Sequence, residues 1–392
     1  MTLDAPSFLL DETPAPLPPL RELRQRLADV DFAATGRLPW PGNAADALLD
    51  PTVLQAWRHG ERALFHRSTL GPVLRRRLAR SRPEAVELHE LLTLGSSLEL
   101  PRVRTLLGGD LVDQLLAAQV LEQVAGKVRA NVMATPFDDL LFLSDPVRLQ
   151  DHPDYVYAGR SSFSPLDHPS LTEVTGRALD LGCGAGFAAV AAAAAGAKEA
   201  VGSDIVERCL RFGRLNAELN GVGDRTQFVR SDVYRGIDGD FDLIVANTPC
   251  VWDALQQAVF ATGGGEFGTE LPVRMVSESL DHLRPGGTVL VVMTAPVVGG
   301  RPLVLDVLAA ACGDHEVSAD VYPQISEYEF EHAVTYREHD ISEFVRYRVV
   351  IAQGARRPVQ LHPAEDRWFA AYRRRARTAR LLGSAATHVR SR

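Results

Sequence analysis

The sequence predicts an α/β protein with a doubly wound, mostly parallel sheet of seven strands and a helical domain in front of it. Three observations support this fold class. Strand-like and helix-like segments alternate between about residues 151 and 355, which is typical of a parallel sheet covered by helices. A glycine-rich turn joins the first of these strands to a helix, and the segment before residue 150 has mainly helical periodicity.

The composition is that of a globular protein. The 392 residues are enough for two domains, and 46% of them are hydrophobic and 23% charged. No apolar run reaches the roughly 18 residues of a membrane span, so we expect no membrane association. The first twenty residues hold acids and five prolines, which favours a flexible lead-in over a signal peptide. The four cysteines lack zinc spacing, so we expect no metal site and a reducing, cytoplasmic location.

Residues 21–150 are expected to form a helical domain that ends in a β-hairpin. Apolar residues recur at three- and four-residue spacing up to about Gly126. In VAGKVRANVMATP and FDDLLFLSD the apolar residues instead recur at every second position. This pattern predicts two strands joined by a proline-containing turn. Helices followed by a hairpin resemble a winged helix. The helical segment DLVDQLLAAQVL holds two aspartates and no basic residue, which favours a packing or substrate-covering role over DNA binding.

Charge is unevenly distributed along the chain. The net charge of −8 argues against a surface that is attracted to nucleic acid throughout. Between Ala355 and Arg392, however, there are ten arginines and two acids. Residues 356–392 are therefore expected to form a basic tail or helix, which either faces RNA or is a solvated end.

The expected sheet elements follow one another from residue 178. The last two strand-like segments follow the last helix, which predicts an antiparallel hairpin at the sheet edge. In order, the strand-like and helix-like segments are ALDLG, GFAAVAAAAAGA, EAVGSDI, VERCLRFGRLNAELNG, TQFVRSD, FDLIVANTP, VRMVSESLDHL, GTVLVVMTA, LVLDVLAAACG, HEVSADVYP and VRYRVVIAQG.

The loop ALDLGCGAGF predicts a binding site for a nucleoside. Gly182, Gly184 and Gly186 separate a buried strand from an alanine-rich helix, and missing side chains let the backbone turn sharply and approach a ligand. A dinucleotide fingerprint would place the third glycine one residue later, where Phe187 stands. The alternative is that these glycines only make a tight turn.

Acidic residues at three successive strand ends indicate which nucleoside cofactor is bound. Asp180 precedes the loop and suits an ammonium group. Asp204 lies 24 residues further on and suits the ribose hydroxyls, and Asp232 suits an adenine amino group. Ile205 and Val233, which follow these acids, are expected to contact the cofactor as well. Three carboxylates without a basic residue fit a cationic adenosine with an amino-acid arm, which is S-adenosyl-L-methionine.

Together these residues resemble the class I S-adenosylmethionine-dependent methyltransferases. The resemblance rests on Asp-Leu-Gly-Cys-Gly-Ala-Gly with Asp204 and Asp232, and it covers about residues 151–354. It implies a Rossmann-like catalytic domain, expected here at 151–355, and transfer of a methyl group.

The segment LIVANTPCVW resembles the Asn-Pro-Pro-aromatic motif of amino methyltransferases. The resemblance implies that Asn247 and Pro249 are catalytic, with Asn247 beside the cofactor and accepting a hydrogen bond from the substrate NH2. Cys250 replaces the aromatic ring, whose stacking on a nucleobase is worth about 1–3 kcal/mol. Either Trp252 supplies the aromatic face on which the substrate stacks, or the substrate is not flat. Alternatively, Asn247 caps a turn and Cys250 fills the core.

Two further segments bear on the site. TGGGEFGTEL resembles the glycine-rich segment after this motif in HemK-type protein-glutamine methyltransferases and the "small" rRNA guanine methyltransferases. DYVYAGRSSFSPLDHPSL precedes the cofactor loop, where such enzymes place a lid. In a lid, Tyr157 and Phe163 would contact substrate and Arg160 the cofactor carboxylate; a plain linker is the alternative.

The leading functional hypothesis is N-methylation of a small-molecule substrate, because the body of the chain is acidic and the motif is altered. Methylation of rRNA or of a protein glutamine is the alternative within the same chemistry. Transfer or cyclisation of the aminocarboxypropyl arm also remains open, as does a winged-helix sensor of S-adenosylmethionine. His168 and His282 are interpreted as surface or packing residues.

Overall fold

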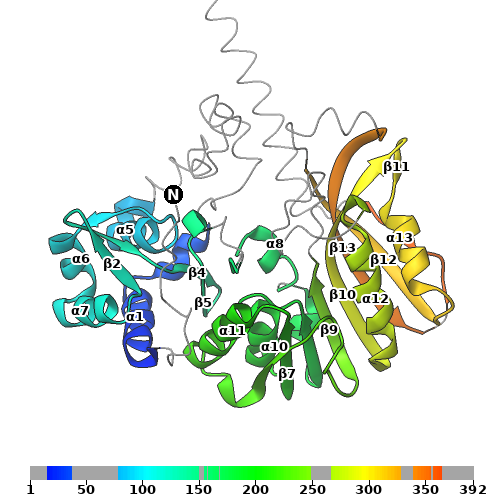
Figure 1. Cartoon of the computed structure of the whole chain (residues 1–392), viewed down its shortest axis with the longest axis horizontal. Coiled ribbons are helices and arrows are strands. Elements are labelled where there is room, and N and C mark those ends of the chain that lie inside the picture. The colour runs from blue at the N-terminus through cyan, green and yellow to red at the C-terminus, as the bar shows by residue number, and fades with distance from the viewer. Residues whose placement is uncertain are drawn as a thin grey trace, which may run out of the picture. The chain divides into compact units, whose positions relative to one another are not determined.

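The computed structural model describes residues 16–37, 78–149, 154–156, 158–166, 168–248, 266–327, 339–354 and 356–363. They fall into two compact units, of which the first ends at Ile237 and the second begins at Asp238. The protein is α/β with a helical N-terminal region, as the sequence predicted (Figure 1). The units do not divide at residues 150 or 355, and the domain boundaries drawn from the sequence stay predictions.

The described part of the first unit opens with helices whose apolar residues face inward. In α1 (Leu17–Asp29) the buried residues Leu20, Leu23 and Leu27 recur every three or four positions, as one helix face requires. The short helix η1 (Phe32–Arg37) follows α1, and the next helices are α5 (Pro83–Leu92), α6 (Leu100–Leu107) and α7 (Gly109–Ala117). A proline stands in the first turn of α1, α5 and α6, where its missing N–H would have no helical partner.

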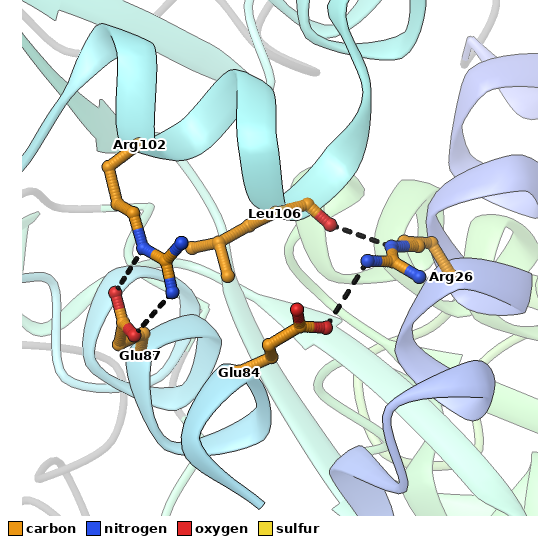
Figure 2. Close-up of polar contacts among 5 residues, drawn as sticks. All are labelled: Arg26, Glu84, Glu87, Arg102 and Leu106. Atoms are coloured by element: carbon orange, nitrogen blue, oxygen red, sulfur yellow. Dashed lines mark hydrogen bonds and ion pairs between the residues drawn. The ribbon is translucent and has the colours of Figure 1, made fainter.

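Two arginines tie these helices together (Figure 2). Arg26 on α1 donates to the Leu106 carbonyl at the end of α6 over 2.6 Å, and to Glu84 on α5 over 3.3 Å. Arg102 on α6 makes a bidentate pair with Glu87 on α5, at 2.8 and 2.7 Å, which lowers the pKa of Glu87. The Arg26 bond satisfies one of the carbonyls that a helix end leaves without a partner.

Two hairpins follow these helices, where the sequence predicted one. Strands β2 (Leu121–Val124) and β3 (Lys127–Ala130) join β1 (Leu98–Glu99) in the order β1-β3-β2. Strands β4 (Met133–Phe137) and β5 (Leu140–Ser144) form a separate antiparallel pair. The single hairpin expected from VAGKVRANVMATP and FDDLLFLSD is thus divided between two hairpins, and the winged-helix likeness stays a prediction.

The predicted proline-containing turn was wrong. Pro136 lies within β4, opposite Leu141, and such a residue is tolerated in a two-stranded sheet that leaves edges unpaired. The chain turns instead at Ala125–Gly126 and at Asp138, where φ is +50°, +82° and +47°. Positive φ at the central residues is what a tight hairpin turn needs.

The rest of the first unit alternates strands and helices. Strands β6 (Arg177–Leu181), β7 (Glu199–Asp204) and β8 (Thr226–Arg230) are parallel and adjacent in that order. Helices α10 (Phe187–Ala195) and α11 (Glu207–Leu219) connect them and pack against them (Figure 1). Short helices lie around these elements: η3 (Val147–Leu149), α8 (Arg160–Phe163), α9 (Pro169–Thr172) and η4 (Gly223–Arg225).

The second unit carries the other strands of the expected series. Strand β9 (Phe241–Asn247) runs parallel to β10 (Leu283–Val298), and β13 (Ile341–Gln353) lies antiparallel to β10 and to β12 (Val317–Glu327). The strand order is β14-β12-β13-β10-β9, so the antiparallel hairpin expected after the last helix is present. The remaining elements are η5 (Glu266–Gly268), α12 (Glu270–Asp281), β11 (Arg301–Pro302), α13 (Val304–Cys312) and β14 (Gln360–Leu361).

The Gly213→Ala substitution should destabilise the first unit. A methyl group added to this buried residue of α11 would overlap the Phe228 ring, and overpacking of a close-packed core costs about 1–3 kcal/mol. Urea denaturation measures the change. Gly109→Ala is the control, because its methyl group meets only the end of the Arg104 side chain, at 3.3 Å. Equal stability of the two variants would contradict the packing described.

Candidate functional site

The glycine loop has the backbone that the sequence predicted. Gly182, Gly184 and Gly186 have φ values of +70°, +51° and +79°, a region that residues with side chains seldom enter. A methyl group on Gly186 would lie 2.8 Å from the Phe228 ring, whereas one on Gly184 would meet nothing within 4 Å. Gly186 is thus required by internal packing, and Gly184 leaves open space beside the backbone.

Asp180, at the end of β6, caps the helix that follows the loop. Its Oδ2 atom accepts hydrogen bonds from the amides of Ala188 and Ala189, at 2.9 and 3.0 Å, in the first turn of α10. The carboxyl group is buried, and burial raises its pKa to about 7 despite these bonds. A helix N-terminus usually offers its free amides to an anion. Here a protein carboxylate occupies two of them, which disfavours a pyrophosphate at this position.

Asp204, the last residue of β7, joins the glycine loop to the next helix. Oδ2 accepts from the Gly184 amide at 2.9 Å, and Oδ1 accepts from the Val206 amide at 3.0 Å. Burial raises the pKa of this carboxyl group, and the backbone bonds oppose the rise. The Cys209 thiol and the Ile205 amide also donate to this carboxylate, so its binding of the hydroxyls of a ligand stays a prediction.

The turn after β8 is shaped by a serine. The Ser231 hydroxyl lies 2.7 Å from the carbonyl oxygens of both Val233 and Arg235. Val233 has a φ of +54°, which is rare for a β-branched residue and costs about 1–3 kcal/mol. Asp232, half-exposed, lies 3.8 Å from Arg235, and Ile205 is exposed. The contact of Ile205, Asp232 and Val233 with a cofactor stays a prediction.

Asn247 is the last residue of β9, in the second unit, and pairs in register with Val292 of β10. Thr248, which stands where the motif has a proline, donates its amide to the Val292 carbonyl at 3.0 Å and its hydroxyl to the same oxygen at 3.2 Å. A proline could make neither bond. The substitution therefore anchors the backbone directly after Asn247 to β10.

The other predicted site residues lie partly outside the described chain. Pro249, Cys250, Trp252 and Tyr157 are outside it, as is the basic tail from residue 364, and Arg160 is described by its backbone alone. Phe163 packs among the rings of Phe137, Phe142 and Phe187, with centroids 5.7, 5.8 and 4.9 Å away. The structure thus places Phe163 in an aromatic cluster, and its contact with substrate stays a prediction.

Sequence reasoning missed the side chains that hold this region together. Arg208, in the first turn of α11, forms a buried bidentate ion pair with Asp145, at 3.0 and 2.5 Å. Asn216, on the same helix, is fully buried and donates to the Ala185 carbonyl in the glycine loop at 2.9 Å. The sequence feature that could have revealed Asn216 is the segment NAELN. It places two asparagines four residues apart on a helix face that should otherwise be apolar.

Within the described ranges, no three His, Cys, Asp or Glu side chains are grouped as a metal site would need. No helix of those ranges is long and apolar enough to cross a membrane. Cys183, Cys209 and Cys312 are buried free thiols, and the cytoplasmic location stays a prediction.

Comparisons with known proteins decide the family. The methyltransferase small domain model matches residues 166–319. A protein of Methanocaldococcus jannaschii, provisionally named protein N5-glutamine methyltransferase, is 30% identical over 155 residues, which are 38% of this chain and 77% of the relative. The chain belongs to the class I S-adenosylmethionine-dependent methyltransferases. It is thus a transferase of this class, and S-adenosylmethionine is its cofactor.

Other similarities are more partial. The release factor glutamine methyltransferase of Rhodopirellula baltica is 33% identical over 147 residues, so this chain spans about half (48%) of that relative. A 16S rRNA N2 G1207 methyltransferase of T. thermophilus, solved in complex with AdoMet and guanosine, is 18% identical, with a TM-score of 0.37 over 62% of this chain and 61% of the other.

The residues around the glycine loop of the first unit fit this cofactor, and their contact with it stays a prediction. The backbone of Gly184 has open space beside it, and the buried acidic groups favour a cation. The described residues of the loop bring Asp180, Gly184 and Asp204 together. Asn247 belongs to the second unit and is described with β10.

The raised pKa of Asp180 predicts a pH-dependent stability. Between about pH 4 and about pH 7 the folded protein holds a proton on Asp180 that the unfolded chain has lost, so stability falls as pH rises through this window. Asp180→Asn is neutral throughout and can still accept both amide bonds. Urea denaturation at about pH 5 and about pH 8 should show wild-type losing stability relative to the variant. A pH-independent difference would contradict this.

Asp204→Ala should weaken S-adenosylmethionine binding. Hydrogen bonds to a charged group are worth about 1.5–3 kcal/mol, so the Kd measured by calorimetry should rise by about one to two orders of magnitude. Asp224→Ala is the control, because it removes the same charge from an exposed position of the first unit. An unchanged Kd for Asp204→Ala, or an equal rise for both variants, would mean that Asp204 has no role at the cofactor.

Proposed function

We propose that this methyltransferase transfers a methyl group to the side-chain amide nitrogen of a glutamine in a protein substrate. Two observations taken together support the proposal. Asn247 stands at the carboxyl end of β9, in a motif that resembles Asn-Pro-Pro-aromatic, and the chain spans 77% of a relative named for glutamine methylation. The second named relative is a release factor glutamine methyltransferase. The small-molecule substrate favoured from the sequence has no support among these relatives.

Asn247 would act by orienting the acceptor. When bound, the cofactor supplies an activated methyl group on a sulfonium. The amide oxygen of Asn247 and the backbone carbonyl after it would accept the two N–H groups of the glutamine, which leaves the nitrogen facing the methyl carbon. The nitrogen–carbon bond forms as the carbon–sulfur bond breaks, and the extra proton leaves to solvent. Positioning is the main contribution asked of the protein.

The backbone at this position is well suited to that task. The two bonds from Thr248 to the Val292 carbonyl fix the residue whose own carbonyl would accept from the substrate. The rigidity that the motif's first proline would supply is thus replaced by hydrogen bonds to the neighbouring strand. In this proposal Trp252 takes the place of the motif's aromatic residue and stacks on the planar amide of the substrate.

A guanine amino group of RNA is the second candidate acceptor. It is favoured by the ten arginines between Ala355 and Arg392, which could neutralise phosphates. A planar NH2 on an sp² carbon is common to guanine and glutamine, so the same Asn247 geometry would serve both.

Methyl-labelled cofactor distinguishes these acceptors. Purified release factors, ribosomal proteins, rRNA and small metabolites are incubated separately with the enzyme, and label is located by mass spectrometry. The proposal expects one added methyl group on a glutamine side chain. Label in rRNA that falls steeply with salt, and that is lost on deletion of residues 364–392, would favour the second candidate. Label only in metabolites, or release of methylthioadenosine, would contradict both.

Asn247→Ala should lower turnover far more than it lowers cofactor affinity. Loss of acceptor orientation of this kind costs about 10²-fold in kcat, while the Kd for cofactor should change little. Asp314→Ala is the control, because it changes a fully exposed side chain of the same unit. An equal loss of kcat and of cofactor affinity in Asn247→Ala would show that its role is misassigned.

A further inference from the structure

Two asparagines of α11 pair with the backbone of β5 as a neighbouring strand would. The Asn216 side chain accepts from the Leu143 amide at 2.8 Å and donates to the Leu143 carbonyl at 2.9 Å. Asn220 does the same with Leu141, at 3.0 and 2.8 Å. All four bonds join the β4–β5 hairpin of the N-terminal region to a helix of the cofactor-binding region.

The spacing explains why both pairs can form. Positions i and i+4 of a helix are about 6 Å apart along its axis, and alternate residues of a strand are about 6.6–6.8 Å apart. Two asparagines one turn apart therefore match two successive outward-facing backbone groups of β5. The hairpin, which has only two strands, gains hydrogen bonds along an edge that would otherwise need water or another strand.

Asn216 also reaches the cofactor loop. Its second amide hydrogen is donated to the Ala185 carbonyl at 2.9 Å, between Gly184 and Gly186. The side chain is fully buried and uses its acceptor once and both donors once. One residue is thus bonded to the hairpin and to the loop at the same time.

A second contact fixes the same hairpin beside the site. Asp145 follows β5 and forms the buried ion pair with Arg208, four residues after Asp204. Asp145 also accepts from the Val156 amide at 2.9 Å. The end of β5 is therefore attached to the start of α11, and its middle is attached to the glycine loop through Asn216.

We infer that Asn216 is a positioning residue that couples docking of the β4–β5 hairpin to the conformation of the glycine loop, so that the N-terminal region controls cofactor affinity. The inference concerns the cofactor and holds for either methyl acceptor. Because such coupling is reciprocal, cofactor binding must also stabilise the docked hairpin.

Two isosteric variants test the coupling. Asn216→Asp and Asn220→Asp each keep the acceptor for a β5 amide and lose the donated bonds. Both weaken the hairpin, but only Asn216→Asp also breaks the bond to Ala185. Calorimetry with S-adenosylhomocysteine should show the Kd rising at least about tenfold for Asn216→Asp, and by a smaller amount of about threefold for Asn220→Asp, which acts through the hairpin alone. An unchanged Kd in either variant, or an equal rise in both, would overturn the inference.

Hydrogen exchange on the wild-type chain gives a test that needs no variant. Addition of S-adenosylhomocysteine should slow exchange of the Leu141 and Leu143 amides by about tenfold, since a bound ligand shifts the opening equilibrium of the elements coupled to it. Unchanged exchange with the ligand bound would overturn the coupling. A wild-type chain that does not bind S-adenosylmethionine would overturn the proposed function instead.

Discussion

The cofactor site depends on one aromatic ring. Phe228, on β8, fills the space left by the missing side chains of Gly186 in the loop, Gly202 on β7 and Gly213 on α11. A methyl group on any of the three would be too close to the ring, so close-packing requires glycine at all of them. This contact holds the loop, the strand and the helix close together. In this arrangement the Asp204 carboxylate accepts from the Gly184 amide.

Electrostatics then decides what the site can bind. Asp180 is buried and Asp204 is half-buried, and burial raises the pKa of each. A cationic ligand would relieve the cost of two nearby carboxylates, and an anionic one would increase it. Because Asp180 also occupies amides at the start of α10, the helix end that serves phosphates in dinucleotide sites is closed here. The local chemistry and the family assignment agree on a sulfonium nucleoside.

Local sequence features predicted the site better than long-range ones. The three loop glycines were visible because their backbone demands glycine, and the strand-end acids were visible because parallel strands end at one edge. The capping role of Asp180 was not predicted, since it depends on where the amides of α10 point. Pro136 was misassigned to a turn because a proline inside a strand is unusual and gives no signal of its partner.

The coupling of the N-terminal region to the loop was beyond sequence reasoning altogether. Asn216 meets Leu143 across 73 residues, and no local periodicity encodes such a contact. In the segment NAELN the two asparagines stand out on a face that should otherwise be apolar, but the sequence does not show what they bind. The burial of Asn216 is explained only by the amides and carbonyls that β5 supplies. The acceptor was likewise open from the sequence, because a motif that lacks its aromatic ring does not specify a substrate.

A crystal structure with S-adenosylhomocysteine tests the central claim most directly. The account predicts that the ribose hydroxyls bind the Asp204 carboxylate and that the ligand lies against Gly184, while Asp180 keeps its bonds to α10. A ligand bound elsewhere, with Asp204 contacting only groups of the protein, would contradict it.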